Sequence, residues 1–391
     1  MKHFKYLFLI LVLTTTLGQF FSDLYLPSLP AISKAMSTTI GTTQLTITLY
    51  MLGYSVSALI YGPLSDTIGR KKPLIIGLSL CLIGSAICAF PQNIYILIFG
   101  RLLQGLGGGV GISVTQAIVR DTSKGSNLAK LNSYLAMANV VVIVSAPILG
   151  GYFQEYFNWH ASFMFLLIYS IFVAFLVIFF VPETKSPDRR IKFKFTTYRN
   201  NLLVLLRSKN FVGCQLCLFA LYGGIMAWMT AGPILLLEYL HLTPGQYGWT
   251  CCLCGVTYTC GAFLNAKLVL KVGIKNMLAL GKFFLLLSSG IMLILAMLSY
   301  FNFFVIVLPI MLFMVGGAMF FPNTYAAALT PFGRIAGFAS SLLVSSQIFG
   351  GFISSLAIAV LPCNTQFFLA LILIICSIII IISSRTLIGK I

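Results

Sequence analysis

The sequence predicts an all-α polytopic membrane protein, with twelve transmembrane helices in two pseudo-symmetric six-helix bundles. Three observations lead to this fold class: the composition, the spacing of the apolar runs and the placement of the basic residues. The 391 residues are 59% hydrophobic and 8% charged, with a mean hydropathy of +1.01. Soluble domains carry about 25% charged residues, so a soluble globular protein is excluded.

Twelve apolar runs are long enough to cross a bilayer as helices, which takes about 20 residues each. They lie near residues 6–29, 43–65, 73–91, 95–119, 131–153, 161–181, 211–237, 246–270, 276–298, 303–326, 334–361 and 364–384. The first run follows Lys2 and Lys5, as in a secretory signal peptide. No Ala-x-Ala site follows it, and it continues through Asp23 and Pro27, so we expect it to be the first helix.

The basic residues gather on one side of the predicted bundle. Of the 25 Lys and Arg residues, all but Lys34 and Arg101 lie in segments that share one side when the N-terminus is inside. Basic loops remain in the cytoplasm, so we expect a multi-pass protein of the bacterial inner membrane with both termini cytoplasmic. The formal net charge of +18 then reflects topology, and no nucleic-acid partner is expected.

A basic segment between the sixth and seventh runs marks the domain boundary. The sequence predicts an N-terminal six-helix bundle over 1–182, a cytoplasmic basic linker over 183–210 and a C-terminal six-helix bundle over 211–391. Within the linker, residues 191–206 are expected to form an amphipathic helix.

The loop after the second run reads Gly-Pro-Leu-Ser-Asp-Thr-Ile-Gly-Arg-Lys-Lys. Gly62 allows two helices to approach closely, and Gly69 permits a turn with positive φ. The pattern resembles the signature loop of the major facilitator superfamily, which implies a twelve-helix transporter and a charge cluster of Asp66, Arg70 and Asp121. Two interpretations of Asp66 remain open: an acid that nearby cations neutralise, or a latch that holds one conformation through an ion pair.

The first run contains Asp23, one of seven acids in the chain. An acid within an apolar helix costs on the order of 2.5 to 3.5 kcal/mol unless it faces a wet cavity or is protonated. Gln19 lies one turn earlier on the same helix face. A purely structural alternative is that Asp23 bonds the backbone near Pro27 and Pro30.

The segment that begins at Asp23 reads Asp-Leu-Tyr-Leu-Pro-Ser-Leu-Pro. It resembles the signature Asp-Met-Tyr-Leu-Pro-Ala-Leu-Pro of Bcr/CflA-type multidrug resistance transporters, which are drug/proton antiporters. This resemblance implies an exporter rather than a transporter of unspecified direction.

Arg101 is the one basic residue predicted well inside a span, and it needs acceptors such as Gln104, backbone carbonyls or a neighbouring acid. Its surroundings, Arg-Leu-Leu-Gln-Gly, resemble the superfamily motif Arg-x-x-Gln-Gly. The resemblance implies a role in proton coupling together with Asp23. The alternative is an arginine that extends from a helix start to the outer surface.

The fifth run carries Pro147, Gly150 and Gly151 in a segment that resembles the antiporter motif ending Gly-Pro-x-x-Gly-Gly. Proline frees a backbone carbonyl, and the paired glycines allow the helix to bend or to pack tightly. The resemblance links this motif to export.

Candidates for substrate contact are polar or aromatic residues inside the predicted spans. They are Gln19, Tyr50, Tyr134, Asn139, Tyr222, Trp228, Asn323 and Gln347. An aromatic cavity with one acid suits amphipathic or cationic compounds.

Several other classes of function lack their motifs. The sequence has no Gly-x-x-x-x-Gly-Lys-Ser/Thr loop for ATP and no clustered nucleophile, base or metal ligands, so neither enzyme activity nor catalytic residues are expected.

The cysteines lie mainly in predicted spans and suit packing, with Cys214-x-x-Cys217 a weak redox or zinc signal. Glu238 is either a second proton site or a loop acid.

The sequence therefore predicts a proton-coupled secondary active exporter, an antiporter of small amphipathic compounds such as drugs. It is expected to work as a monomer among membrane lipids, with no metal or cofactor and with the proton gradient as its energy source. The alternatives are export of an endogenous metabolite or siderophore, and facilitator-type import of a small metabolite.

Overall fold

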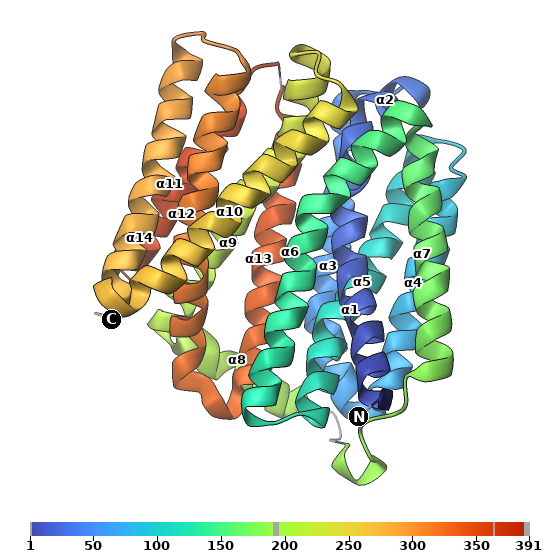
Figure 1. The fold of residues 1–391 in the computed structure, drawn as a ribbon. Helices are drawn as coiled ribbons and strands as arrows, with labels where there is room; N and C mark the ends of the chain where they lie inside the picture. Colours follow the sequence, from blue (N-terminus) through green and yellow to red (C-terminus); the bar gives the residue numbers. More distant parts are fainter. Residues whose placement is uncertain (1, 191–194, 363, 387–391) are drawn as a thin grey trace.

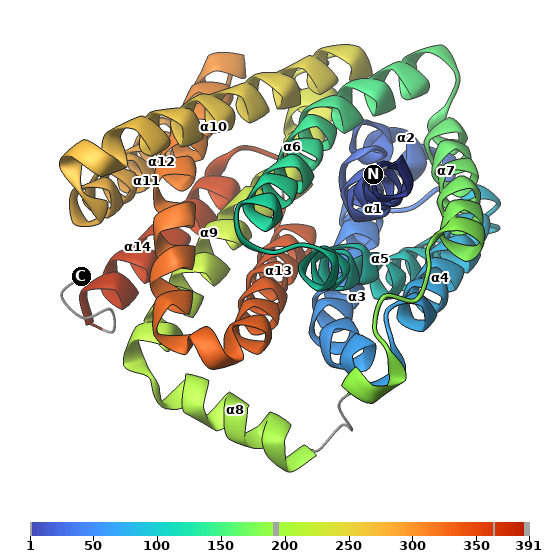
Figure 2. The ribbon, with the colours of Figure 1, turned by 60° about the horizontal axis from the view of Figure 1, so that its bottom comes forward.

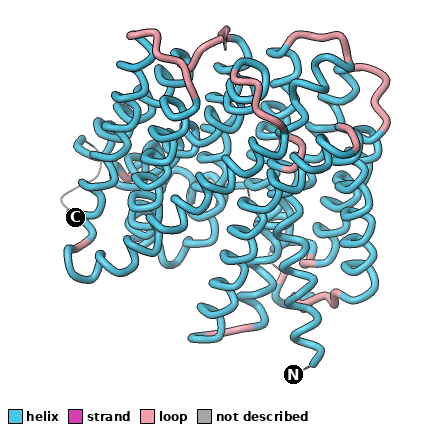
Figure 3. The backbone as a smooth tube through the Cα atoms, turned by 45° about the horizontal axis from the view of Figure 1, so that its top comes forward, coloured by secondary structure: helices cyan, strands magenta, loops and turns pink. Residues whose placement is uncertain are grey.

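The computed structural model describes residues 2–190, 195–362 and 364–386, and most of them are helical (Figure 3). Twelve helical segments in this described part are long and apolar enough to cross a membrane, which confirms the predicted fold class. The first six spans comprise α1 (Lys2–Asp23) with α2 (Leu29–Ala35), α3 (Ile40–Ile68), α4 (Lys71–Ala89), α5 (Ile94–Thr122), α6 (Gly125–Tyr156) and α7 (Trp159–Phe180). The last six comprise α9 (Lys209–Pro233), α10 (Pro244–Val272), α11 (Ile274–Met297), α12 (Phe303–Leu329), α13 (Ala336–Val360) and α14 (Phe367–Thr386).

The spans form two groups that meet in the middle of the molecule (Figure 1). We call α1 to α7 the first half and α9 to α14 the second half. Within the first half α5 packs against both α3 and α4, and within the second half α9 packs against both α13 and α14. Across the halves, α3 packs on α13 and α6 packs on α10.

Polar side chains fix where several spans begin. The residues before α3, α5, α7, α10 and α12 each accept a hydrogen bond from a backbone N–H of the first helical turn, and they are Thr39, Asn93, Asn158, Thr243 and Asn302. Such caps satisfy donors that a helix leaves open at its start. All five starts lie at the end of the bundle away from the N-terminus, which we call the opposite end; the other end, with the N-terminus and the loop at Gly69, is the basic end.

The first span is broken, whereas the sequence predicts one helix over 6–29. Helix α1 ends at Asp23, a 3-10 turn covers Leu26–Ser28, and α2 continues to Ala35. Pro27 and Pro30 lie in the first turns of the two later segments, where a missing N–H is tolerated but a continuous helix is not. The seventh span has a related break, because a π-helical turn over Ile234–Tyr239 follows Pro233.

The linker contains α8 (Phe195–Arg207), which lies across the basic end between the halves (Figure 2). It overlaps the amphipathic helix predicted for 191–206 and extends one residue beyond it, while residues 191–194 lie outside the described residues. The side chain of Leu205 is fully buried in a cluster with Phe211 of α9. Thus α8 is packed against the second half rather than lying free at the surface.

Candidate transport site and its closures

Asp23 lies at the break in the first span, as the last residue of α1. Its side chain is buried, with 1% of the residue exposed. Oδ2 accepts a hydrogen bond from the Nε2 amide of Gln19, and Oδ1 has no hydrogen-bond partner among the described residues. The predicted polar pair of Gln19 and Asp23 is therefore present, at the point where the helix stops.

Asp23 lies near tyrosine side chains from both halves of the molecule. It lies within electrostatic range of Tyr54 in α3, Tyr222 in α9 and Tyr247 in α10. The charge of Asp23 therefore acts on side chains of both halves.

Arg101 is fully buried in α5, so the alternative of a side chain that reaches the outer surface is wrong. Its Nη1 donates to Oε1 of Gln104, and its guanidinium carbon lies 4.3 Å from the ring centre of Tyr25 and 4.4 Å from that of Tyr50. Cation–π contacts strengthen when desolvated, and here two rings enclose one cation.

Arg101 and Asp23 do not form a direct ion pair in the described residues, whose salt bridges all lie at the two ends of the bundle. Nε and Nη2 of Arg101 have no hydrogen-bond partner there, and neither does Oδ1 of Asp23. Buried polar atoms are nearly always paired, so such exceptions suggest function. The centre of the molecule thus holds one acid and one cation with unused bonding capacity.

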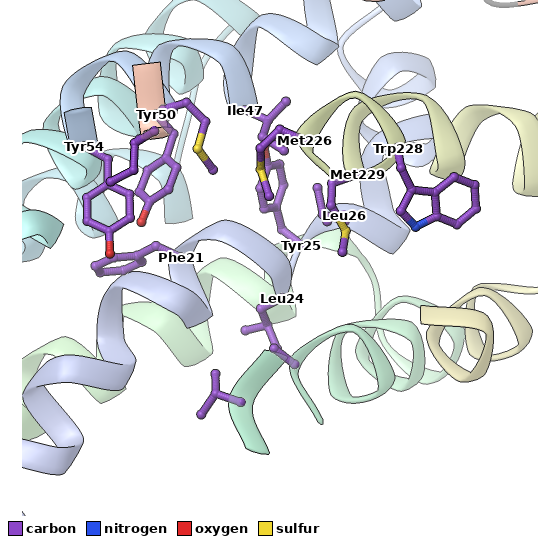
Figure 4. Packing of buried hydrophobic residues seen from close by; sticks show 14 of the residues in the cluster. Phe21, Leu24, Tyr25, Leu26, Ile47, Tyr50, Tyr54, Met226, Trp228 and Met229 are labelled. Carbon is purple, nitrogen blue, oxygen red and sulfur yellow. The ribbon is translucent and has the colours of Figure 1, made fainter. Parts of the chain in front are cut away.

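Aromatic and sulfur-containing side chains pack around the break in the first span, next to Asp23 (Figure 4). Tyr50 and Tyr54 from α3 point toward the first span, and Met226 and Met229 from α9 approach it from the second half, whereas the ring of Trp228 points away from it. The ring nitrogen of Trp228 is buried without a hydrogen-bond partner among the described residues. Tyr222, one turn before Met226, is half-buried on the same helix.

Other substrate candidates lie away from Asp23. Tyr134 is 45% exposed and packs against Phe8 near the basic end. Asn323 is buried inside the second half, where its amide donates to Oδ1 of Asn265 at 2.8 Å. The structure therefore does not bring Tyr134 or Asn323 to the centre.

Two further candidates lie on helices that form the contacts between the halves. Asn139 of α6 is half-buried and donates to the Leu135 carbonyl in its own helix. Gln347 of α13 is half-buried, and its Oε1 has no partner in the part of the chain that the structure describes.

The signature loop brings Asp66, Arg70 and Asp121 together. Arg70 Nη1 lies 2.9 Å from Asp66 Oδ1, and Arg70 Nε lies 2.7 Å from Asp121 Oδ2. Ser65 accepts a further bond from Arg70 Nη1 at 2.7 Å. Gly69 has a φ of 96°, the positive value that the sequence predicts for this glycine.

Two residues of the linker complete this cluster, and no motif in the sequence predicted them. Lys185 Nζ lies 2.7 Å from Asp66 Oδ1 and is nearly buried. The carboxylate of Glu183 accepts from the backbone N–H groups of Arg70 at 2.8 Å and Lys71 at 3.3 Å, at the start of α4. The sequence feature that could have pointed to Glu183 and Lys185 is the Pro-Glu-Thr-Lys segment directly after the sixth run. That segment lies more than 100 residues from its partners in the loop.

The environment of Glu183 fixes its charge. Partial burial disfavours ionisation, but the backbone N–H groups of Arg70, Lys185 and Lys71 outweigh it and lower the pKa of Glu183 below its ordinary value. A lowered pKa in the folded state stabilises that state above the ordinary pKa, and the stabilisation is lost as the pH falls through the lowered value. The cap on α4 is therefore complete at neutral pH.

Replacing Glu183 with alanine is expected to destabilise the loop by about 1 kcal/mol, the usual loss for a helix cap. The measurement is the midpoint of thermal unfolding of the purified protein at neutral pH. The matched control is Asp188→Ala, which removes an exposed acid of the same linker and should leave the midpoint unchanged. Equal midpoints for the two variants would show that Glu183 does not brace the loop.

The antiporter motif packs against the break in the first span and against α10. A Cβ on Gly150 would overlap the carbonyl oxygen of Leu24, and one on Gly151 would overlap that of Pro244. The carbonyl oxygen of Pro147 lies 2.7 Å from where Gly248 would carry a Cβ. Of the two structural roles predicted for the glycine pair, the structure shows tight packing.

The halves are hollowed at both ends. At the opposite end a cavity of about 320 Å³ lies between α3, the π-helical turn and α13, and the cavity at the basic end has a larger volume. This larger cavity of about 790 Å³ lies between α3, α5, α8 and α13, and Asp66, Gln116, Arg120, Tyr198 and Ser341 are among the residues that line it. It is bounded by both halves and by the linker helix.

Among the described residues, no three His, Cys, Asp or Glu side chains gather as metal ligands would. The groups that the centre offers are hydrogen-bonding atoms, aromatic rings and the charges of Asp23 and Arg101. Such a site can bind and release a proton or a small molecule.

Sequence relatives agree with the two resemblances drawn from the motifs. The chain is 28% identical over 357 residues to a "Bicyclomycin resistance protein homolog" of Haemophilus influenzae, covering 91% of this chain and 89% of that protein. It is 28% identical over 363 residues to "Multidrug resistance protein D" of Escherichia coli, covering 92% of this chain and 90% of that protein. Both relatives match across nearly the whole chain.

A solved structure shows the same fold. The structure of a D-xylose-proton symporter superposes with a TM-score of 0.79 at 14% identity, covering 99% of this chain and 98% of the symporter. The family model described as "Major Facilitator Superfamily" matches residues 11–355. The protein is therefore a membrane transporter rather than an enzyme, and the chain belongs to the Major Facilitator Superfamily.

Proposed function

We propose that this transporter is a proton-coupled antiporter that exports small amphipathic compounds such as drugs. The observation that carries the proposal is Asp23, a buried acid at a helix break. One of its oxygens has no hydrogen-bond partner among the described residues, and it lies within electrostatic range of both halves. An acid held at this depth is costly unless it binds a proton or a ligand. The names of the relatives, which refer to drug resistance, support the choice of cargo.

In the proposed cycle, Asp23 releases its proton and accepts the substrate while the site communicates with the basic end. Reprotonation from the opposite end then displaces the substrate. One acid whose proton affinity depends on the side it faces is sufficient for this exchange. The cavity at the basic end and the packed glycines at the opposite end are consistent with a form that loads from the basic end.

Arg101 supports this cycle indirectly. Tyr25, Tyr50 and Gln104 enclose its side chain, so a substrate at the interface meets the acid rather than the cation. This favours neutral or cationic amphipathic compounds over an anionic siderophore. Arg101 then acts by stabilising the ionised form of Asp23 through space.

The proposal also covers the setting of the protein. The distribution of basic residues supports insertion in the bacterial inner membrane with both termini cytoplasmic, which makes the basic end the cytoplasmic one. We further propose an N-terminal bundle over 1–182 and a C-terminal bundle over 211–391, joined by a linker over 183–210. The protein works as a monomer in contact with lipid, without a metal or an organic cofactor.

The test is uptake of labelled amphipathic cations into everted membrane vesicles, with a proton gradient and after a protonophore has collapsed it. Antiport predicts accumulation only while the gradient persists. Accumulation that ignores the protonophore would overturn proton coupling. Accumulation in right-side-out vesicles instead would indicate an importer, and exclusive transport of anionic metabolites would favour the metabolite or siderophore alternative.

A further inference from the structure

The contact between α6 and α10 is confined to one part of these helices. The two helices converge toward the opposite end and diverge toward the basic end (Figures 1 and 2). Near the opposite end their backbones touch, because Gly151 meets Pro244 and Gly248 meets Pro147. Nearer the middle, Gly255 would place a Cβ 2.8 Å from Cγ2 of Val144. We call this contact the α6–α10 seam.

An acid of the first half completes the start of α10. Thr243 and Gln246 cap that helix with a reciprocal pair of hydrogen bonds, and Pro244 has no N–H. The remaining early donor is the N–H of Gly245, which donates to Oε2 of Glu155 at 3.0 Å. The last turn of α6 thus supplies, across the seam, the hydrogen-bond acceptor that α10 lacks.

A second contact lies one turn along each helix. The ring nitrogen of Trp249 donates to the hydroxyl of Tyr152 at 3.2 Å. Trp249 is four residues after Gly245, and Tyr152 is three residues before Glu155, so both contacts share the same helix faces. The seam therefore has two polar links at its rim above its packed glycines.

We propose that Glu155 is a positioning residue that holds the transporter closed at the opposite end, by capping α10 of the other half. The negative charge of Glu155 is favoured at the positive end of α10, and the attraction disappears when the helices separate. The charge cluster of Asp66 and Arg70 lies at the basic end of the bundle. The Glu155 contact therefore acts on closure of the opposite end independently of that cluster. This inference requires only that the transporter opens at this end. It does not depend on proton coupling or on the identity of the substrate.

Other contacts between the halves are poorer candidates for this role. Lys34 and Glu238 form an ion pair at the opposite end at 3.1 Å, but the Lys34 side chain is 72% exposed and such pairs contribute little. The α3–α13 contact continues toward the basic end, where Ser55 and Ser345 bond each other. The α6–α10 seam lies toward the opposite end, whereas the α3–α13 contact begins there with Gly41 against the Ala359 carbonyl and runs to the other end.

A native cysteine reports on the seam. Cys251 is 3% exposed and lies three residues after Gly248 and four before Gly255, so it is on the helix face turned toward α6. Separation of α6 from α10 would expose its thiol. Cys217, which is fully buried between α9 and α14, serves as a reporter of general unfolding.

The experiment compares the native protein with Glu155→Gln in nanodiscs. A hydrophilic maleimide is added and the rate of labelling of each cysteine is followed by peptide mass spectrometry. Loss of the charge-assisted contact should raise the labelling rate of Cys251 about fivefold. The matched control Glu238→Gln, which removes an acid from the other cross-half pair, should stay within about twofold of native.

Labelling of Cys251 at the native rate in Glu155→Gln, with Cys217 protected, would overturn the proposal, and so would an equal rise in Glu238→Gln. If Glu155→Gln also exposes Cys217, the variant is unfolded and Trp249→Phe decides instead. That variant removes the second link without changing charge, and the proposal requires faster labelling of Cys251 in it with Cys217 protected. None of these outcomes bears on whether protons drive export.

Discussion

Replacing Asp23 with asparagine is expected to abolish gradient-driven export. Asparagine has nearly the same shape but a single protonation state, so it cannot exchange a proton for substrate as the site changes its direction of access. We expect uphill accumulation in everted vesicles to fall about 100-fold or more, as when a positioned proton-transferring group is lost. Exchange of labelled for unlabelled substrate should be lost as well, because neutral asparagine resembles the protonated acid that has released its substrate.

The midpoint of thermal unfolding makes this prediction specific. A variant that merely misfolds unfolds at a lower temperature, whereas loss of the proton-binding group removes transport from a protein that keeps the native midpoint. The control Glu238→Gln removes the acid that the sequence offers as a second proton site; because Glu238 pairs with an exposed lysine at the rim, gradient dependence should remain. Uphill export retained in Asp23→Asn but lost in Glu238→Gln would reverse the assignment.

The helices were predictable because each is encoded locally. An apolar run of about 20 residues specifies a span wherever it occurs. Even the break after Asp23 had a local signal in Pro27 and Pro30, although the apolar run that predicted a single helix continues through it. The π-helical turn after Pro233 had no comparable signal, since a proline predicts an interruption but not its type.

The parts of the site that the sequence did not predict are contacts between distant segments. Glu183 meets Arg70 across more than 100 positions, and Glu155 meets Gly245 across 90. A glutamate in a loop carries no sign of the helix start it will cap. Asp66 and Arg70 were found because their loop resembles that of a family, whereas their partners Lys185 and Glu183 lie outside the motif.

The substrate candidates also divide into residues whose role residue type predicts and residues whose role depends on distant contacts. Gln19 and Tyr50 were chosen for residue type and do contact Asp23 and Arg101. Asn323 was chosen on the same ground, but its amide is already bonded to Asn265 inside the second half. A polar residue in an apolar run needs a hydrogen-bond partner. The helix face on which the residue lies decides whether that partner is a neighbouring helix or a substrate.

Replacing Gly150 with alanine is expected to disrupt the molecule more than any other single methyl group in the antiporter motif. The new Cβ would overlap the carbonyl oxygen of Leu24, and a backbone atom cannot rotate away as a side chain can. Overpacking of this kind costs about 1–3 kcal/mol or more. Because Leu24 directly follows Asp23, any shift of α6 that relieves the clash also displaces the acid.

We therefore expect Gly150→Ala to lower the thermal unfolding midpoint and to eliminate export in the same vesicle assay. The matched control is Gly290→Ala in α11, where a Cβ would meet no atom of the described residues within 4 Å. That change should be neutral or slightly stabilising, since alanine is favoured over glycine in a helix by roughly 0.5–1 kcal/mol. If Gly150→Ala behaved like Gly290→Ala in both measurements, α6 would not need to touch the break in the first span. The glycine of the motif would then have a role other than close packing beside Asp23.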